Sequence, residues 1–163
     1  MFRTPRGRAL AIAAFGLASA FALGASPAHA GGCPADKVVA SGQGQPQSNA
    51  PAQGVTDTVI ASIDLAKEPI GIRDRLFRLR KLVIEPGGVV PWHSHGDRPA
   101  IIYIISGEIT EYASTCAVPI VYHAGDSTAE THTTAHWWKN TGSTTVTLLS
   151  ADLFHVNDNA HTM

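Results

Sequence analysis

The fold of this chain is decided by residues 87–107, which read GGVVPWHSHGDRPAIIYIISG. A turn signal at 86–88 opens the stretch, a second follows at 96–99, and an apolar run then leads to Gly107. Side chains two residues apart in an extended chain point to the same side, so His93 and His95 would project together. Two imidazoles on one face beside a turn favour a metal site, and the alternative is a surface His-Ser-His without a ligand.

Short segments of strand-forming residues lie on both sides of this stretch, separated by glycine and proline turn signals. No segment shows a convincing helical period. We therefore expect an all-β sandwich or barrel, with strands over 59–65, 76–84, 100–106, 108–112, 118–122 and 144–153. The turn at 86–88 would follow the second strand, 108–112 would return from 100–106 as a hairpin, and Pro119 would place 118–122 at a sheet edge.

In two of these strands, the interpretation depends on the direction in which the side chains point. Residues 100–106 are apolar on both faces, as expected for a strand that is buried in a closed barrel or sandwich, or covered by a dimer contact. Arg78, Arg80 and Lys81 are interpreted as a solvated basic face, and the alternative is a basic wall that binds substrate.

The first 30 residues have the features of a secretory signal peptide: a basic start, an apolar run over 9–25 and an Ala-x-Ala end at Ala30. A membrane anchor is the weaker alternative, because the apolar run is rich in Ala and Gly and short for a bilayer span. After cleavage we expect a flexible arm of small and polar residues over 31–57, a barrel domain over 58–156 and a tail over 157–163.

The mature chain is mildly acidic. Residues 1–30 contain three of the 12 basic residues and none of the 13 acidic ones, so their removal leaves a net charge of −4. Scattered basic residues on such a chain give no sign of nucleic-acid binding. No other stretch is apolar enough to span a membrane. We expect a periplasmic or secreted protein with one domain and no membrane association after cleavage.

Both cysteines, Cys33 and Cys116, lie in the mature chain. Because an exported compartment permits disulfides, we expect the two to be paired. The alternatives are two free thiols, or a Cys116 that lies near the active site.

A second informative stretch, residues 125–140, reads GDSTAETHTTAHWWKN and again places histidines beside a turn. With it the chain resembles the cupin superfamily over roughly residues 60–155. The first cupin motif is Gly, five residues, His-x-His, then a glutamate and a closing Gly; the second begins with Gly and ends with His, three residues and Asn. The positions that match the two motifs in register are Gly87, His93, His95, Gly107, Gly125, His136 and Asn140.

The resemblance implies a jelly-roll β-barrel with one divalent metal in its mouth, held here by His93, His95 and His136. Iron, manganese, nickel, copper and zinc all suit such ligands. Ala100 stands where the first motif has its glutamate ligand. Three arrangements are open: a three-His metal site, a fourth ligand supplied by Glu130 or His132, and a site that no longer binds metal.

Function is expected to depend on this site. The first hypothesis is a metal-dependent oxygenase, or a related lyase or isomerase, that acts on a small organic molecule. Glu130 or His132 would be its acid-base group, Arg98 would hold a substrate carboxylate, and Trp138 would wall the pocket. For Arg98 the alternative is a solvated turn residue, and for Trp138 it is core packing. The competing hypotheses are a non-catalytic module that binds a small ligand or a metal, and a purely structural barrel; a homodimer is compatible with each.

Overall fold

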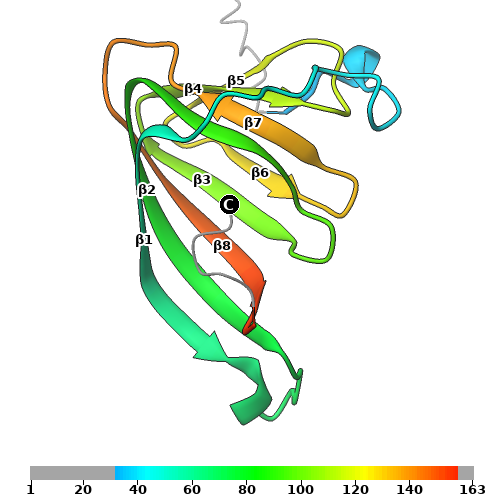
Figure 1. Ribbon diagram of the computed structural model, residues 1–163, viewed down its shortest axis with the longest axis vertical. Coiled ribbons are helices and arrows are strands. Elements are labelled where there is room, and N and C mark those ends of the chain that lie inside the picture. Colours follow the sequence, from blue (N-terminus) through cyan, green and yellow to red (C-terminus); the bar gives the residue numbers. More distant parts are fainter. Residues whose placement is uncertain (1–31, 158–163) are drawn as a thin grey trace, which may run out of the picture.

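The computed structural model describes residues 32–157, so the predicted signal peptide lies outside the described residues. Eight antiparallel strands form one sheet that curls into a nearly closed barrel, which confirms the all-β class (Figure 1). The helical segments of the described range are two 3-10 turns, Ala35–Lys37 and Leu65–Lys67. The strands are β1 Gln53–Asp64, β2 Arg75–Ser94, β3 Ala100–Ser106, β4 Glu108–Ala113, β5 Ile120–His123, β6 Ser127–Glu130, β7 Ala135–Lys139 and β8 Val146–His155.

The turn signal at 86–88 does not end a strand, because β2 continues through it. Residues 75–84 of β2 pair with β8, whereas residues 89–94 pair with β7, so one strand serves two sides of the barrel. Gly87 has a φ of 78°, and a Cβ at Gly88 would lie 2.8 Å from the Glu85 backbone oxygen. The Pro-Gly-Gly segment is therefore a corner at which the strand bends from one layer to the other.

The expected hairpin between β3 and β4 is wrong. β3 pairs with β6 and β8, whereas β4 pairs with β5 and β7. Gly107, between the two strands, has a φ of 84° and packs against Val146, which lets the chain turn away from β3 instead of folding back along it. The expected edge position of the strand after Pro119 is confirmed, since β5 lies at one end of the strand order.

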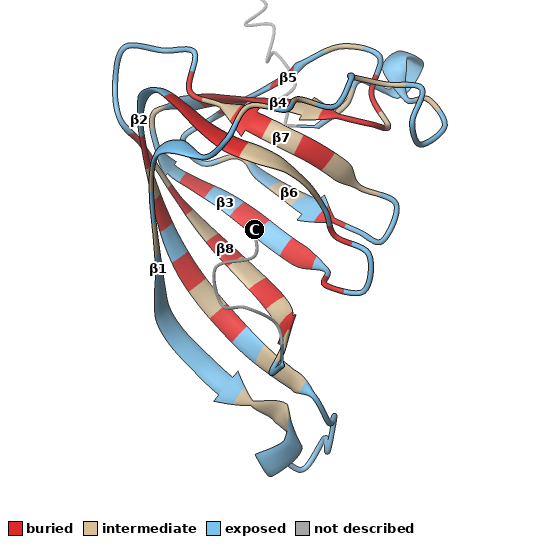
Figure 2. Cartoon of the chain, in the orientation of Figure 1, coloured by how far each residue is buried: buried red, intermediate tan, exposed pale blue. Residues whose placement is uncertain are grey.

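β3 is buried on one face only, which corrects the expectation of burial on both. Ile102 and Ile104 face the core, while Ile101, Tyr103 and Ile105 face outward and are 60%, 46% and 46% exposed (Figure 2). The barrel wall is a single layer here, and within residues 32–157 no second layer covers it. A dimer contact over this outer face stays a prediction.

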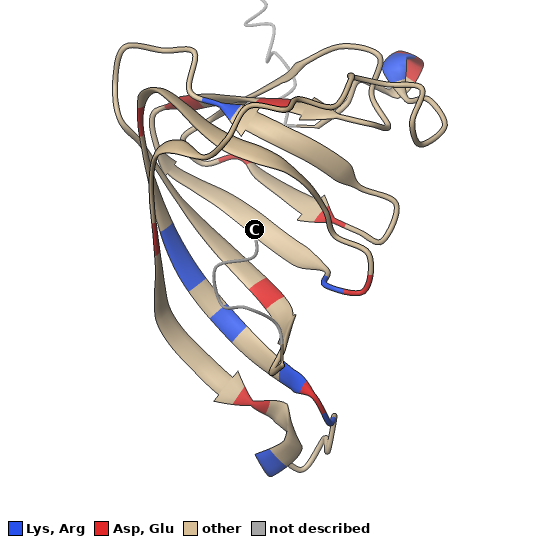
Figure 3. Cartoon of the chain, in the orientation of Figure 1, with Lys and Arg blue, Asp and Glu red and all other residues tan. Residues whose placement is uncertain are grey.

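The prediction of a solvated basic face is also wrong for two of its three residues. Arg78 and Arg80 are 2% and 6% exposed and share strand parity with Leu82, so they point into the barrel, whereas Lys81 points outward. Arg78 lies directly across from Asp152 on β8, and blue and red bands mark this charged part of the two strands (Figure 3).

The segment that precedes β1 in the sequence lies alongside the end of β4 and the residues after it. The amides of Gly42 and Gly44 donate to the Ser114 carbonyl oxygen, and a disulfide joins Cys33 to Cys116. β1 itself begins at Gln53, ahead of the expected strand, and the flexibility of the arm stays a prediction. Within residues 32–157 no helix has the length and apolar character that crossing a membrane requires.

Candidate metal centre

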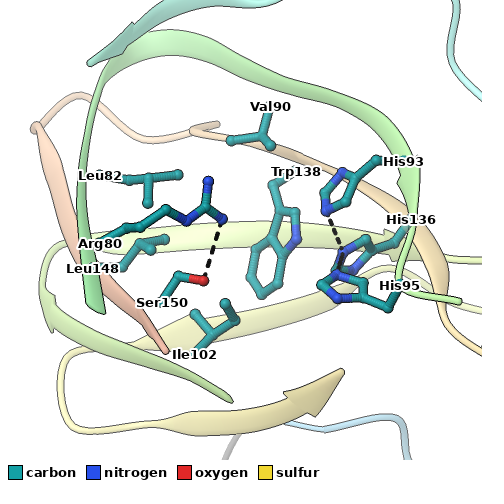
Figure 4. A pocket seen from close by; sticks show the side chains of 10 residues that line it. All are labelled: Arg80, Leu82, Val90, His93, His95, Ile102, His136, Trp138, Leu148 and Ser150. Atoms are coloured by element: carbon teal, nitrogen blue, oxygen red, sulfur yellow. Dashed lines mark hydrogen bonds between the residues drawn. The ribbon is translucent and has the colours of Figure 1, made fainter. Parts of the chain in front are cut away.

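The register of β2 against β7 brings the three motif histidines together. His93 lies directly across from His136, and the amide of His95, just past the end of β2, donates to the Thr134 carbonyl oxygen. The Nε2 atom of His136 is 3.1 Å from Nε2 of His93 and 3.0 Å from Nε2 of His95. The Nε2 atoms of three histidines thus point toward one another, although His136 is 43 residues from His93 and 41 from His95 in the sequence (Figure 4).

The Nδ1 atom of each ring faces an acceptor on the opposite side. His93 Nδ1 is 2.9 Å from the Pro91 carbonyl oxygen, and His95 Nδ1 is 3.0 Å from the Arg98 carbonyl oxygen. A carbonyl oxygen only accepts, so each Nδ1 carries the proton and donates it. The Nε2 atoms of these two rings therefore present lone pairs.

Glu111 on β4 plays the same part for His136 and was missed by the sequence analysis. Its Oε1 lies 2.5 Å from His136 Nδ1, and both side chains are buried. Tyr122 donates its hydroxyl to the other carboxyl oxygen at 2.8 Å, which fixes the carboxyl group. With Glu111 ionised, His136 donates from Nδ1 and its Nε2 is a third free lone pair.

Burial keeps all three rings neutral. It lowers the pKa of His93 well below 6.5, the pKa of His95 to about 4 and the pKa of His136 to about 3. The neighbouring imidazoles lower the pKa values of His93 and His95 further, and the charge of Arg98 lowers that of His136 further. Neutral imidazole is the form that binds metal. Three lone pairs that converge repel one another, and a cation between them removes that repulsion.

The donor set fits a divalent transition metal. Two nitrogen ligands at about 2.1 Å from one ion and at right angles to each other are about 3.0 Å apart, which agrees with the two measured Nε2 separations. Imidazole nitrogen suits iron, nickel, copper and zinc, whereas manganese prefers oxygen ligands. Burial raises the pKa of Glu111 to about 7, and above that pH its carboxylate provides a negative charge one ring behind the site, whereas Ala100 provides none within it.

Glu130 lies on the far side of His136 from the Nε2 atoms. It is the direct cross-strand neighbour of Ala100, and its Oε2 is 3.4 Å from His136 Nδ1. Its Oε1 is buried without a hydrogen-bond partner in the described part of the chain. Burial, and then the charge of Glu111, raises the pKa of Glu130, so the carboxyl group is neutral at neutral pH. Glu130 thus contacts the ligand set from behind, beside Glu111.

A cavity of about 30 Å³ opens beside the three histidines. Trp138, predicted as a pocket wall, lies between the histidines and the opposite end of the cavity (Figure 4). The remaining lining residues are Arg80, Leu82, Val90, Ile102, Leu148 and Ser150.

The other two predicted site residues lie outside this cavity lining. His132 is exposed in the turn between β6 and β7. Arg98 is buried instead of solvated, and its backbone oxygen orients His95. Of the residues that contact the histidines, Glu111 had one signal in the sequence, since it shares strand parity with the apolar residues Ile109 and Ala113.

Comparisons with known proteins agree with this geometry. The model of the cupin domain family matches residues 80–152. No curated protein sequence matches the chain significantly.

Two solved structures have a similar fold. A predicted oxalate decarboxylase from Thermotoga maritima is 23% identical, with 72% of this chain and 98% of that chain covered and a TM-score of 0.51. An uncharacterized protein with a double-stranded β-helix domain from Klebsiella pneumoniae is 17% identical, with 71% and 87% covered and the same TM-score. Since the matched residues include both histidine-bearing segments, residues 80–152 form a cupin domain.

Proposed function

We propose that this protein binds one divalent transition metal through His93, His95 and His136 and uses it to act on a small organic molecule. The observation that carries the proposal is the convergence of three neutral imidazole Nε2 atoms, two of them 3.0 and 3.1 Å from the third. Each Nδ1 is held by an acceptor, so no ring can rotate its lone pair away without losing a hydrogen bond.

Three protein ligands leave further coordination positions open toward the cavity. A metal held there supplies a Lewis acid for an oxygen of the substrate and, if it is iron, a means of activating dioxygen. The chain's own residues orient the ligands and exclude bulk water, with Trp138 and the aliphatic side chains of Leu82 and Ile102 walling the cavity. An oxygenase, or a related lyase or isomerase, is the reaction class we propose.

We also propose that the protein works outside the cytoplasm, in the periplasm or after secretion. The disulfide between Cys33 and Cys116 supports this, because such bonds persist in oxidising compartments. The signal-peptide features of residues 1–30 point the same way.

Elemental analysis of the mature protein, purified without an affinity tag or chelator, tests the metal assignment. We expect one equivalent of a single transition metal, and its loss in the variant His136→Ala. The matched control is His123→Ala, because His123 on β5 is exposed and its ring lies beside Glu108 and Asp126, outside the ligand set. A folded protein without metal, or unchanged metal content in His136→Ala, would contradict the proposal.

Turnover separates an enzyme from a binding module. The metal-loaded protein would be assayed for oxygen uptake and product formation with small organic acids, diketones and thiols. The small cavity favours substrates of few atoms and is also compatible with a module that only retains a ligand or metal. Saturable ligand binding without product, across the panel, would establish the binding module instead.

A further inference from the structure

A buried cation lies at the other end of the cavity that the three histidines line. Arg80 comes from β2, is 6% exposed and lines the cavity together with Ser150, its direct cross-strand neighbour on β8. Figure 4 shows its guanidinium at one end, the histidines at the other, and Trp138 between them. The cavity therefore has two polar ends and an apolar middle.

The hydrogen-bond donors of Arg80 are only partly used. Its Nη1 donates to Asp57 at 2.6 Å and its Nη2 donates to the Ser150 hydroxyl at 3.3 Å, which is long for a charged donor. Its Nε is buried without a hydrogen-bond partner in the described part of the chain. A guanidinium has five N–H donors, so this side chain retains capacity for another acceptor.

The nearest other carboxylate does not fill that capacity. Asp152 is bound by the Arg78 fork, with Nε at 2.9 Å and Nη2 at 2.6 Å, while its distance to Arg80 Nε is 3.7 Å. Arg78 thus holds Asp152 through two hydrogen bonds, although the Nη1 of Arg78 is also buried without a hydrogen-bond partner in the described part of the chain. Arg80 is left with one firm partner, Asp57, on the side of β1.

We propose that Arg80 and Ser150 bind the carboxylate of a small organic acid whose other end reaches the three-His site. This inference rests on the proposed function, since it names the class of substrate for the same cavity. The planar guanidinium and the hydroxyl match the two oxygens of a carboxylate, which would complete the donors of a buried cation. The aliphatic and indole walls match a short hydrocarbon segment between the two ends.

The geometry selects this class over others. A cavity of about 30 Å³ admits an acid of a few heavy atoms and leaves little room for a phosphate ester or a sugar. Arg80 already forms an ion pair with Asp57, so it offers its unused donors to one carboxylate, and Arg78 is held by the Asp152 carboxylate. A neutral ligand of the same shape would leave the Arg80 donors with a weaker acceptor.

The test compares acetate and propionate with acetamide and propionamide, in the protein as purified and after removal of metal by a chelator. Binding would be followed by NMR titration. In the metal-free protein, where no ion can coordinate an anion, we expect each acid to bind about tenfold more tightly than its amide. Equal affinity for acid and amide in that form would overturn the inference.

Three variants test whether acid binding depends on Arg80 and Ser150. Ser150→Ala should weaken acid binding several-fold, and Arg80→Lys, which keeps a charge beside Asp57 but lacks the fork, should remove most of the preference for acid over amide. The matched control Lys81→Met removes a cation from the next residue of the same strand, on the outer face, and should change nothing. Unchanged acid binding in both Ser150→Ala and Arg80→Lys, with their melting temperatures preserved, would overturn the inference.

Metal content separates this inference from the proposed function. If the protein holds no metal yet binds acids through Arg80, the proposed function fails and the carboxylate site stands. If it holds metal and shows no preference for acids in the metal-free form, the metal site stands and the assignment of Arg80 is wrong.

Discussion

Replacing Glu111 by glutamine should weaken metal binding about tenfold, although Glu111 would not touch the ion. Its Oε1 lies 2.5 Å from His136 Nδ1, and the two side chains are 3% and 1% exposed, so water cannot replace the carboxylate. A hydrogen bond with a charged partner contributes about 1.5–3 kcal/mol, roughly twice a neutral one. Glutamine keeps a neutral bond, so about half is lost, and about 1.4 kcal/mol corresponds to tenfold. This is the lower end of the range known for partners of metal-bound histidines, about 10–100-fold.

Competition with a calibrated chelator at pH 7.5 would measure the affinity of the wild type and of Glu111→Gln for the same ion. The matched control is Glu108→Gln, which removes the same charge from the same strand at an exposed position. An affinity of Glu111→Gln within twofold of the wild type would refute the role of Glu111 in orienting His136. An equal loss in Glu108→Gln would show that the effect is one of net charge and not of the contact.

Three further predictions concern stability. Burial raises the pKa of Glu130 above 4.5, so the folded state keeps a proton that the unfolded state releases, and the free energy of unfolding falls by up to about 1.4 kcal/mol per pH unit as the pH rises above that value. Urea unfolding of the metal-free protein between pH 5 and 8 should show a smaller fall in this free energy for Glu130→Gln than for the wild type. Parallel curves for the two proteins would contradict this prediction. Replacing Cys33 and Cys116 together by alanine should lower the free energy of unfolding by about 2–4 kcal/mol, and unfolding curves that coincide with the wild type would exclude the bond. Gly88→Ala should cost about 1–3 kcal/mol, because its Cβ would meet a backbone oxygen at 2.8 Å, whereas Gly142→Ala meets its nearest atom at 3.4 Å and serves as the control in thermal melting.

The sequence predicted the parts of this molecule that follow from local spacing. The i, i+2 relation of His93 and His95 and the second motif with His136 identified the ligand set, and the all-β class followed from short strands between turn signals. Ala100 was recognised as the missing ligand position. The pairing of His93 with His95 was predictable because side-chain direction in a strand depends on parity, whereas His136 and the position of Ala100 followed from the resemblance to the cupin motifs.

The wrong β3–β4 hairpin and the missed role of Glu111 have one physical cause, which is that strand pairing depends on contacts far apart in the sequence. Nothing near Gly107 shows that β3 pairs with β8 while β4 pairs with β7. Glu111 reaches His136 through that second pairing, so it could not be assigned without it. Arg80 is different: its parity with Leu82 was visible, and it was grouped instead with Lys81 of opposite parity.

The position of Asp57 has a consequence for the local opening of β1. Asp57 lies on β1, which within residues 32–157 pairs with β2 alone, so the counter-ion of an interior cation lies on a strand with a single described neighbour. Such strands open at lower free energy than central ones, and each opening would withdraw Asp57 from Arg80. An anion bound to the unused donors of Arg80 would share the charge of that guanidinium with Asp57 and so weaken its contact with β1. By reciprocity, occupancy of the cavity should speed hydrogen exchange in β1, and a docked β1 should weaken the anion's hold by the same factor.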